Sequence, residues 1–303
     1  MIYRLAIIFF LFTSFQPAKK DPFIAILGIT QDAGYPQIGC DKECCKKYWD
    51  KKIAKQKVSC LALFDPSTNQ KWIFDATPDL TEQLKAADKL QKGNLTGIFL
   101  THAHVGHYTG LMYLGREALN AKEVPVYVMS RMYDFLKTNG PWSQLVSLKN
   151  IQLQKLNADS PIILTPKISI TPILVPHRDE FSESVGYSIK TENKTALFIP
   201  DIDKWQKWDR DIKQIVREFD YLFLDGTFYE ENELPGRIMS EVPHPFIRES
   251  VDLFNDLSLA EKHKIWFIHF NHTNPLLDKT SNQYKEVKSK GFNVAVDGLK
   301  ISL

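Results

Sequence analysis

Three histidines, His102, His104 and His107, lie within six residues of one another. The first two are two positions apart at the end of a predicted strand, so their side chains point the same way and can bind one metal ion. His107 falls at the turn into a helical stretch, where it can reach a second position beside the first. Imidazole is a common ligand for zinc, manganese and iron. The triplet therefore predicts a metal site.

Three of the four cysteines, Cys40, Cys44 and Cys45, crowd one short stretch, and Cys60 lies on a later predicted strand. Thiolates at this spacing, with a fourth ligand such as His272, would complete a tetrahedral structural zinc site. In an exported protein a disulfide from this cluster to Cys60 is the alternative, and free thiols are a third possibility.

The composition is that of a globular protein. The 303 residues are 44% hydrophobic and 24% charged, and 38 Lys+Arg against 36 Asp+Glu give a net charge of +2. These values exclude collagen-like, coiled-coil and intrinsically disordered classes. A nearly neutral chain gives no electrostatic reason to expect a stable nucleic-acid partner.

The N-terminal segment has the pattern of a signal peptide over residues 1–20, with Arg4 followed by an apolar run over 5–15. The run is too short to span a bilayer comfortably, and no later segment is apolar enough to be a membrane span. We therefore predict export to the periplasm or the extracellular space. An uncleaved anchor or a buried first strand are the alternatives, and without a signal peptide the protein would be cytoplasmic.

Short β-branched and aromatic runs predict strands at 23–29, 58–64, 72–74, 97–101, 124–129, 151–156, 168–175, 185–191, 196–200, 221–225, 264–269 and 292–296. Helical patterns lie between them, at 78–90, 211–219 and 245–257. No linker or repeat divides the two groups of strands. This order predicts one α/β domain over residues 21–303, built from two packed sheets flanked by helices.

The histidine block resembles the His-x-His-x-Asp-His motif of the metallo-β-lactamase superfamily. The remaining ligand order of that superfamily can be found downstream. Pro176-His177, followed by residues 184–188, resembles the segment that supplies the third ligand in ribonuclease Z and phosphodiesterase relatives. The strand ends at Asp201 and His269 resemble those that carry the bridging carboxylate and the last histidine. The resemblance implies a four-layer αββα sandwich.

The resemblance also implies ligand roles. His102, His104 and His177 would bind one metal, His107 and His269 a second, and Asp201 would bridge the two. A water held between the metals would lose a proton more easily and become the nucleophile. We expect zinc, with one or two ions bound, and manganese or iron are alternatives.

The chain departs from the motif at Gly106, where the superfamily has Asp and where glycine offers no ligand atom. Asp32, on a loop after the first predicted strand, is a candidate partial replacement. Asp203 and Asp225 are further candidates, although their positions are more typical of turn and strand-end residues. A single-metal and a dinuclear site both stay open. Gly106→Asp is expected to raise occupancy of the second position.

Four further segments resemble the family of pyrroloquinoline quinone biosynthesis protein B, at 28–40, 73–80, 271–278 and 296–298. In that family the first two motif histidines are commonly replaced and the Asp is kept. This chain does the reverse, so its metal site is more similar to that of the phosphodiesterases.

The leading functional hypothesis, which the resemblance implies, is a metal-dependent hydrolase that cleaves an ester or phosphodiester bond in a small-molecule or phosphodiester substrate. Its catalytic residues would be Asp201, Asp32 and His244. His244 would protonate the leaving group, because histidine titrates near neutrality; the alternative is a loop or capping histidine. A mononuclear iron or copper oxidoreductase acting on a quinone precursor and a non-catalytic metal-binding protein are the other hypotheses.

Overall fold

The structure, a computed structural model, describes residues 21–234, 236 and 238–303. The predicted signal peptide over residues 1–20 lies outside this range. Among the described residues, no helix has the length and apolar character needed to cross a membrane.

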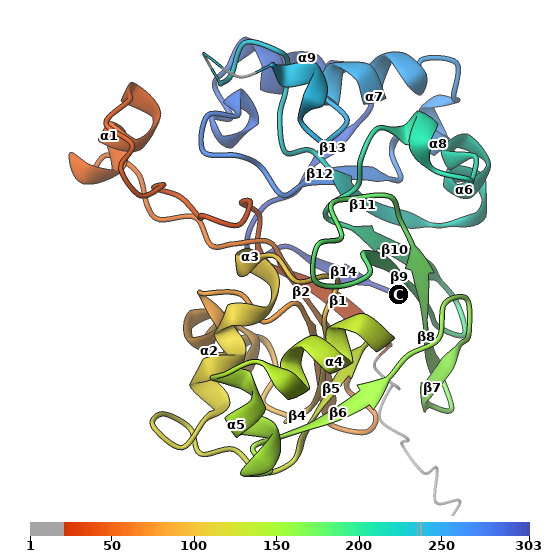
Figure 1. Cartoon of the computed structure of the whole chain (residues 1–303). Helices are drawn as coiled ribbons and strands as arrows, with labels where there is room; N and C mark the ends of the chain where they lie inside the picture. The colour runs from red at the N-terminus through yellow and green to blue at the C-terminus, as the bar shows by residue number, and fades with distance from the viewer. Residues whose placement is uncertain (1–20, 235, 237) are drawn as a thin grey trace, which may run out of the picture.

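The strands form two sheets of seven (Figure 1). The first has the order β14 (Lys300–Ser302), β1 (Phe23–Gly28), β2 (Cys60–Asp65), β3 (Gln70–Phe74), β4 (Asn94–Phe99), β5 (Val124–Val128) and β6 (Ile151–Lys155). The second has the order β13 (Asn293–Val294), β12 (Ile265–Ile268), β11 (Tyr221–Asp225), β10 (Thr195–Ile199), β9 (Val185–Lys190), β8 (Ile168–Leu174) and β7 (Ile162–Thr165). All twelve predicted strands are present, whereas the short strands β7 and β14 were not predicted.

Helices cover the outer face of each sheet (Figure 1). Leu80, Met132 and Leu145 pack with the first sheet, whereas Val216, Val251 and Val287 pack with the second. The α-helices are α1 (Glu43–Trp49), α2 (Leu80–Leu90), α3 (Val105–Tyr108), α4 (Ser130–Thr138), α5 (Trp142–Ser147), α6 (Ile212–Glu218), α7 (Ile247–Leu253), α8 (Leu259–Lys262) and α9 (Asn282–Ser289). Short 3-10 helices span Thr109–Leu114, Trp205–Lys207, Met239–Glu241 and Pro275–Leu277.

The central strands are buried on both faces, which explains their continuous apolar sequence. In β2, Leu61 packs in the cluster between the sheets, whereas its neighbour Ala62 packs in the cluster beneath the helices. The two sheets meet through aromatic rings: Phe74 lies 5.5 Å from Tyr187 and 6.2 Å from Phe198 between ring centroids. The predicted αββα sandwich is confirmed.

The strand directions place several chain segments at one edge of the sandwich. Strands β3, β4 and β5 run parallel in the first sheet, and β10, β11 and β12 run parallel in the second. Strand β8 runs the same way as β10, because each pairs antiparallel with β9. Parallel strands bring their carboxyl ends together, so the loops that follow them share one edge.

Candidate metal centre

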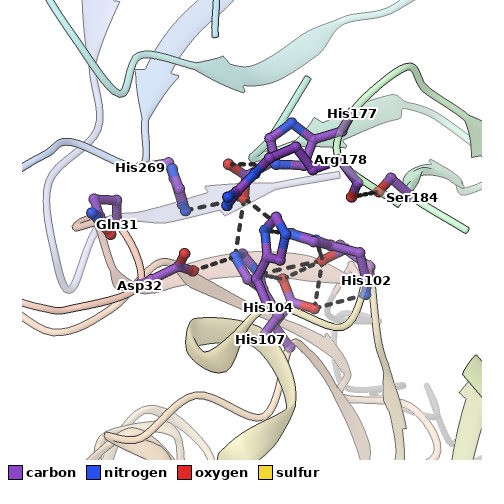
Figure 2. A network of polar contacts seen from close by, with 12 residues as sticks. Gln31, Asp32, His102, His104, His107, His177, Arg178, Ser184 and His269 are labelled. Carbon is purple, nitrogen blue, oxygen red and sulfur yellow. Dashed lines mark hydrogen bonds and ion pairs between the residues drawn. The ribbon is translucent and has the colours of Figure 1, made fainter. Parts of the chain in front are cut away.

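The predicted ligands converge at this edge, although they come from six different segments (Figure 2). His102 and His104 follow β4, and His107 lies in α3. Single residues come from the loops after β1, β8, β10 and β12, namely Asp32, His177, Asp201 and His269. Residues up to 237 positions apart in the sequence therefore form one cluster.

The side chains fall into two groups with ligand spacing. The ligand atoms of His102, His104 and His177 lie within 4.8 Å of one another, as do those of Asp32, His107 and His269. Within the first group, His102 Nε2 lies 2.8 Å from His104 Nδ1. These are the two positions that the sequence predicted, with Asp32 added to the second.

Asp201 lies between the two groups. Its Oδ2 is 3.0 Å from His107 Nε2, 3.1 Å from His269 Nε2 and 3.9 Å from His102 Nε2. Its Oδ1 is 3.9 Å from His177 Nε2. One carboxylate thus faces four imidazoles from both groups, which is the placement expected of a bridging ligand.

Second partners fix the orientation of three of the imidazole rings. His107 Nδ1 lies 2.7 Å from Asp75 Oδ2, and His269 Nδ1 lies 2.9 Å from Thr227 Oγ1. His102 Nδ1 lies 3.0 Å from Thr101 Oγ1, whose hydroxyl also contacts Asp75. A histidine whose outer nitrogen is held in this way presents its other nitrogen to a metal in a fixed direction.

Sequence reasoning missed Asp75, Thr101 and Thr227. Asp75 lies in the segment 73–80 that carried the family resemblance, and this was the available signal. It is fully buried and has a left-handed backbone, with φ 69°. His269 also has a positive φ, 68°. Strained backbone at a buried polar residue is typical of functional sites.

Burial keeps four of the histidines neutral, which is the form that binds a metal. It lowers the pKa of His102, His104 and His269, and lowers that of His177 to about 4. Burial also acts to lower the pKa of His107, but the carboxylates of Asp75, Asp201 and Asp32 outweigh it and raise that pKa.

Several buried polar atoms in the cluster have no hydrogen-bond partner among the described residues. These atoms are Asp32 Oδ1, His104 Nε2, His107 Nε2, both ring nitrogens of His177, Asp201 Oδ2 and His269 Nε2. An unpaired buried polar atom is costly, and native proteins contain few of them. These unpaired atoms are imidazole nitrogens and carboxylate oxygens, and this donor set fits zinc, manganese or iron.

His244 lies beside the cluster and is held by Asp225. The His244 Nδ1 to Asp225 Oδ2 distance is 2.7 Å, and Asp225 also accepts hydrogen bonds from the Ile202 backbone N–H and from Thr227. Asp225 therefore positions both His244 and Thr227. Its position at a strand end did not predict this role. Asp203 lies outside the cluster and pairs with Lys207 at 2.7 Å.

The cysteines form a separate group. The ligand atoms of Cys40, Cys44, Cys45 and His272 lie within 4.8 Å of one another, around α1 and the loop after β12. Cys60 is buried on β2, where its thiol lies 3.7 Å from the carbonyl oxygen of Asp75. All four cysteines are free, so the alternative of a disulfide to Cys60 is wrong.

A cleft of about 490 Å³ opens over the second group of ligands. Asp32, His269 and His244 lie in its wall, together with Arg178 and Asn271. This volume is that of a small-molecule site.

Thr227→Val is expected to weaken metal binding about 10- to 100-fold, because it removes the hydroxyl that orients His269. Isothermal titration with zinc or manganese measures this change. Thr227→Ser keeps the hydroxyl and serves as the control. Equal affinity of the Val and Ser variants would contradict the orienting role of Thr227.

Comparison with known proteins places the chain in a family. The model of the beta-lactamase superfamily domain matches residues 70–270. Coenzyme PQQ synthesis protein B of Acinetobacter baumannii (strain ACICU) is 30% identical over 314 residues, covering 92% of this chain and 99% of that protein.

Two solved structures share the fold. Zinc-bound PqqB from Methylobacterium extorquens superposes with a TM-score of 0.78 at 22% identity, covering 93% of this chain and 100% of that one. A diphosphatase from the PhnP family superposes with a TM-score of 0.66 at 22% identity, covering 93% and 98%. The chain therefore belongs to the metallo-β-lactamase superfamily and is a homologue of coenzyme PQQ synthesis protein B.

Proposed function

We propose that the protein is a metal-dependent hydrolase that cleaves a phosphodiester or related ester bond. The observation that carries the proposal is the position of Asp201, whose carboxylate lies within 3.9 Å of four imidazoles from two ligand groups. Such a shared carboxylate is what a two-metal hydrolytic site requires.

The candidate ligands would hold two metal ions. His102, His104 and His177 would hold one ion, and Asp32, His107 and His269 a second, with Asp201 shared between them. Bound metal ions would lower the pKa of a water and stabilise charge on the group under attack.

Two residues of the cleft wall would act on the substrate. Arg178 is exposed there, and its positive charge contributes to lowering the pKa of His104, so it favours an anionic substrate over a neutral ester. His244, fixed by Asp225, would give a proton to the leaving group.

The direct test uses protein stripped with a chelator and reloaded with zinc, manganese or iron(II). We expect hydrolysis of bis(p-nitrophenyl) phosphate to return with zinc or manganese. The homologous PQQ synthesis proteins match this chain over nearly their full length, which makes an oxidoreductase the competing function. Iron-dependent oxygen consumption without hydrolysis by any reloaded form would contradict the proposal.

We also propose that Cys40, Cys44, Cys45 and His272 hold a structural zinc, because three thiols and one imidazole at this spacing match a closed tetrahedral site. Cys45→Ser is then expected to remove one zinc per chain and to lower the melting temperature. Elemental analysis and thermal unfolding measure both effects. Cys60→Ala is the control, since Cys60 lies outside the group. Unchanged zinc content in Cys45→Ser would refute this site.

A further inference from the structure

We propose that Asp32 is a metal ligand that has taken the place of the missing carboxylate at position 106. The inference rests on the metal site of the proposed function. It adds that the missing carboxylate is supplied by a different segment of the chain. The carboxylate would come from the loop after β1 and not from α3.

The first observation is the space around Gly106. A Cβ atom placed on this residue would lie 2.5 Å from Asp32 Cα and closer still to Asp32 Oδ1. Part of this contact is with the backbone of residue 32, which cannot rotate away as a side chain can. Asp32 thus occupies the space that the Cβ of a side chain at position 106 would need. A carboxylate at position 32 and one at position 106 therefore cannot both be accommodated.

The second observation is where the Asp32 carboxylate points. Its Oδ1 lies 3.0 Å from His107 Nε2 and has no hydrogen-bond partner among the described residues. With His107 and His269 it forms a group of ligand spacing. Figure 2 shows its side chain directed at His107, on the side of the cluster where His269 also lies.

The third observation is that neighbouring backbone holds this loop in place. The backbone N–H of Gln31 donates to the Phe270 carbonyl at 2.9 Å, and that of Gly34 donates to the Gln31 carbonyl at 2.8 Å. Phe270 directly follows His269. A backbone hydrogen bond therefore joins the segment that supplies Asp32 to the segment that supplies His269. This bond holds the two side chains close enough to bind one ion.

Charge supplies the fourth argument. The carboxylates of Asp32, Asp75 and Asp201 all lie within 3.0 Å of a nitrogen of His107, which carries at most one positive charge. Asp75 and Asp201 are buried and Asp32 is 24% exposed, so three carboxylates crowd one imidazole and a cation would reduce their mutual repulsion. A divalent ion held by Asp32 and Asp201 is such a cation.

This geometry corrects the expectation that Gly106→Asp raises occupancy of the second position. With Asp32 in place the new side chain has no room. The substitution is expected to lower metal content and thermal stability.

Substitutions at the two positions test the proposal. Asp32→Gly should lose one metal per chain, because it removes the carboxylate. Gly106→Asp should also lose it, because a Cβ at position 106 would meet the Cα of residue 32. Elemental analysis of zinc-loaded protein, isothermal titration and melting temperature provide readouts that do not depend on activity. Asp32→Asn keeps the shape of the side chain and should weaken binding of one ion by at least about 100-fold.

The outcomes separate the two proposals. If the wild-type cleft binds no metal, the proposed function fails. If the wild type binds two ions and Asp32→Asn still binds both with unchanged affinity, only the role of Asp32 is overturned. Should Asp32→Gly or Gly106→Asp not fold, the Asp32→Asn titration alone decides.

Discussion

Asp201→Asn is expected to lower kcat/KM for a phosphodiester by about 10³-fold or more, since metal ions contribute several kcal/mol to the stabilisation of such transition states. The substitution keeps the size of the side chain and removes its charge. Asp201 is the carboxylate common to both ligand groups, and its side chain is only 4% exposed. Because its carboxylate faces both groups, neither metal position should keep its full affinity.

Steady-state kinetics and metal content together measure this effect. Asp203→Asn is the matched control: it changes the same residue type two positions later, where the carboxylate pairs with Lys207 outside the cluster. The control should retain wild-type metal content and activity. An Asp201→Asn protein with both ions and full activity would remove Asp201 from the site.

His244→Gln is expected to lower kcat by about 10²- to 10⁴-fold, the usual contribution of a general acid, while metal content stays unchanged. The expectation follows from geometry. Asp225 is fully buried and holds the Nδ1 of His244 at 2.7 Å, so the ring is fixed at the wall of the cleft beside Asp201. This arrangement leaves the second ring nitrogen available for proton transfer.

The dependence on the leaving group distinguishes this role from a structural one. A p-nitrophenyl leaving group needs little protonation, so the deficit of the variant should be larger for phenyl or alkyl phosphodiesters. Loss of metal from His244→Gln would instead show that His244 is a ligand, since its ring also forms a group of ligand spacing with His177 and Asp201. An equal deficit for all leaving groups would contradict proton transfer.

The order of five histidines and Asp201 along the chain was sufficient to predict that these six side chains lie together, because nearly all of them follow an apolar strand whose end is recognisable in the sequence. The residues that orient them were not predictable in this way. Thr227 and Asp75 contact the ring nitrogens of His269 and His107 that face away from the site. No pattern in the neighbouring sequence predicts these contacts. Their roles depend on which strands pair, which local periodicity does not determine.

The same limit applies to Asp32 and Gly106. The sequence showed that a carboxylate is absent from the motif, but residues 32 and 106 are far apart in the chain. Their contact arises because β1 and β4 lie in one sheet and their following loops meet at one edge. The short strands β7 and β14 were missed for a related reason: they are defined by their pairing with β8 and β1.

The most direct test of the central claim is anomalous diffraction from crystals of the full chain grown with zinc or manganese. We expect two peaks, one among His102, His104 and His177 and the other among Asp32, His107 and His269, with Asp201 in contact with both. A single peak at the first group, with Asp32 turned away from His107 and His269, would contradict a two-metal site.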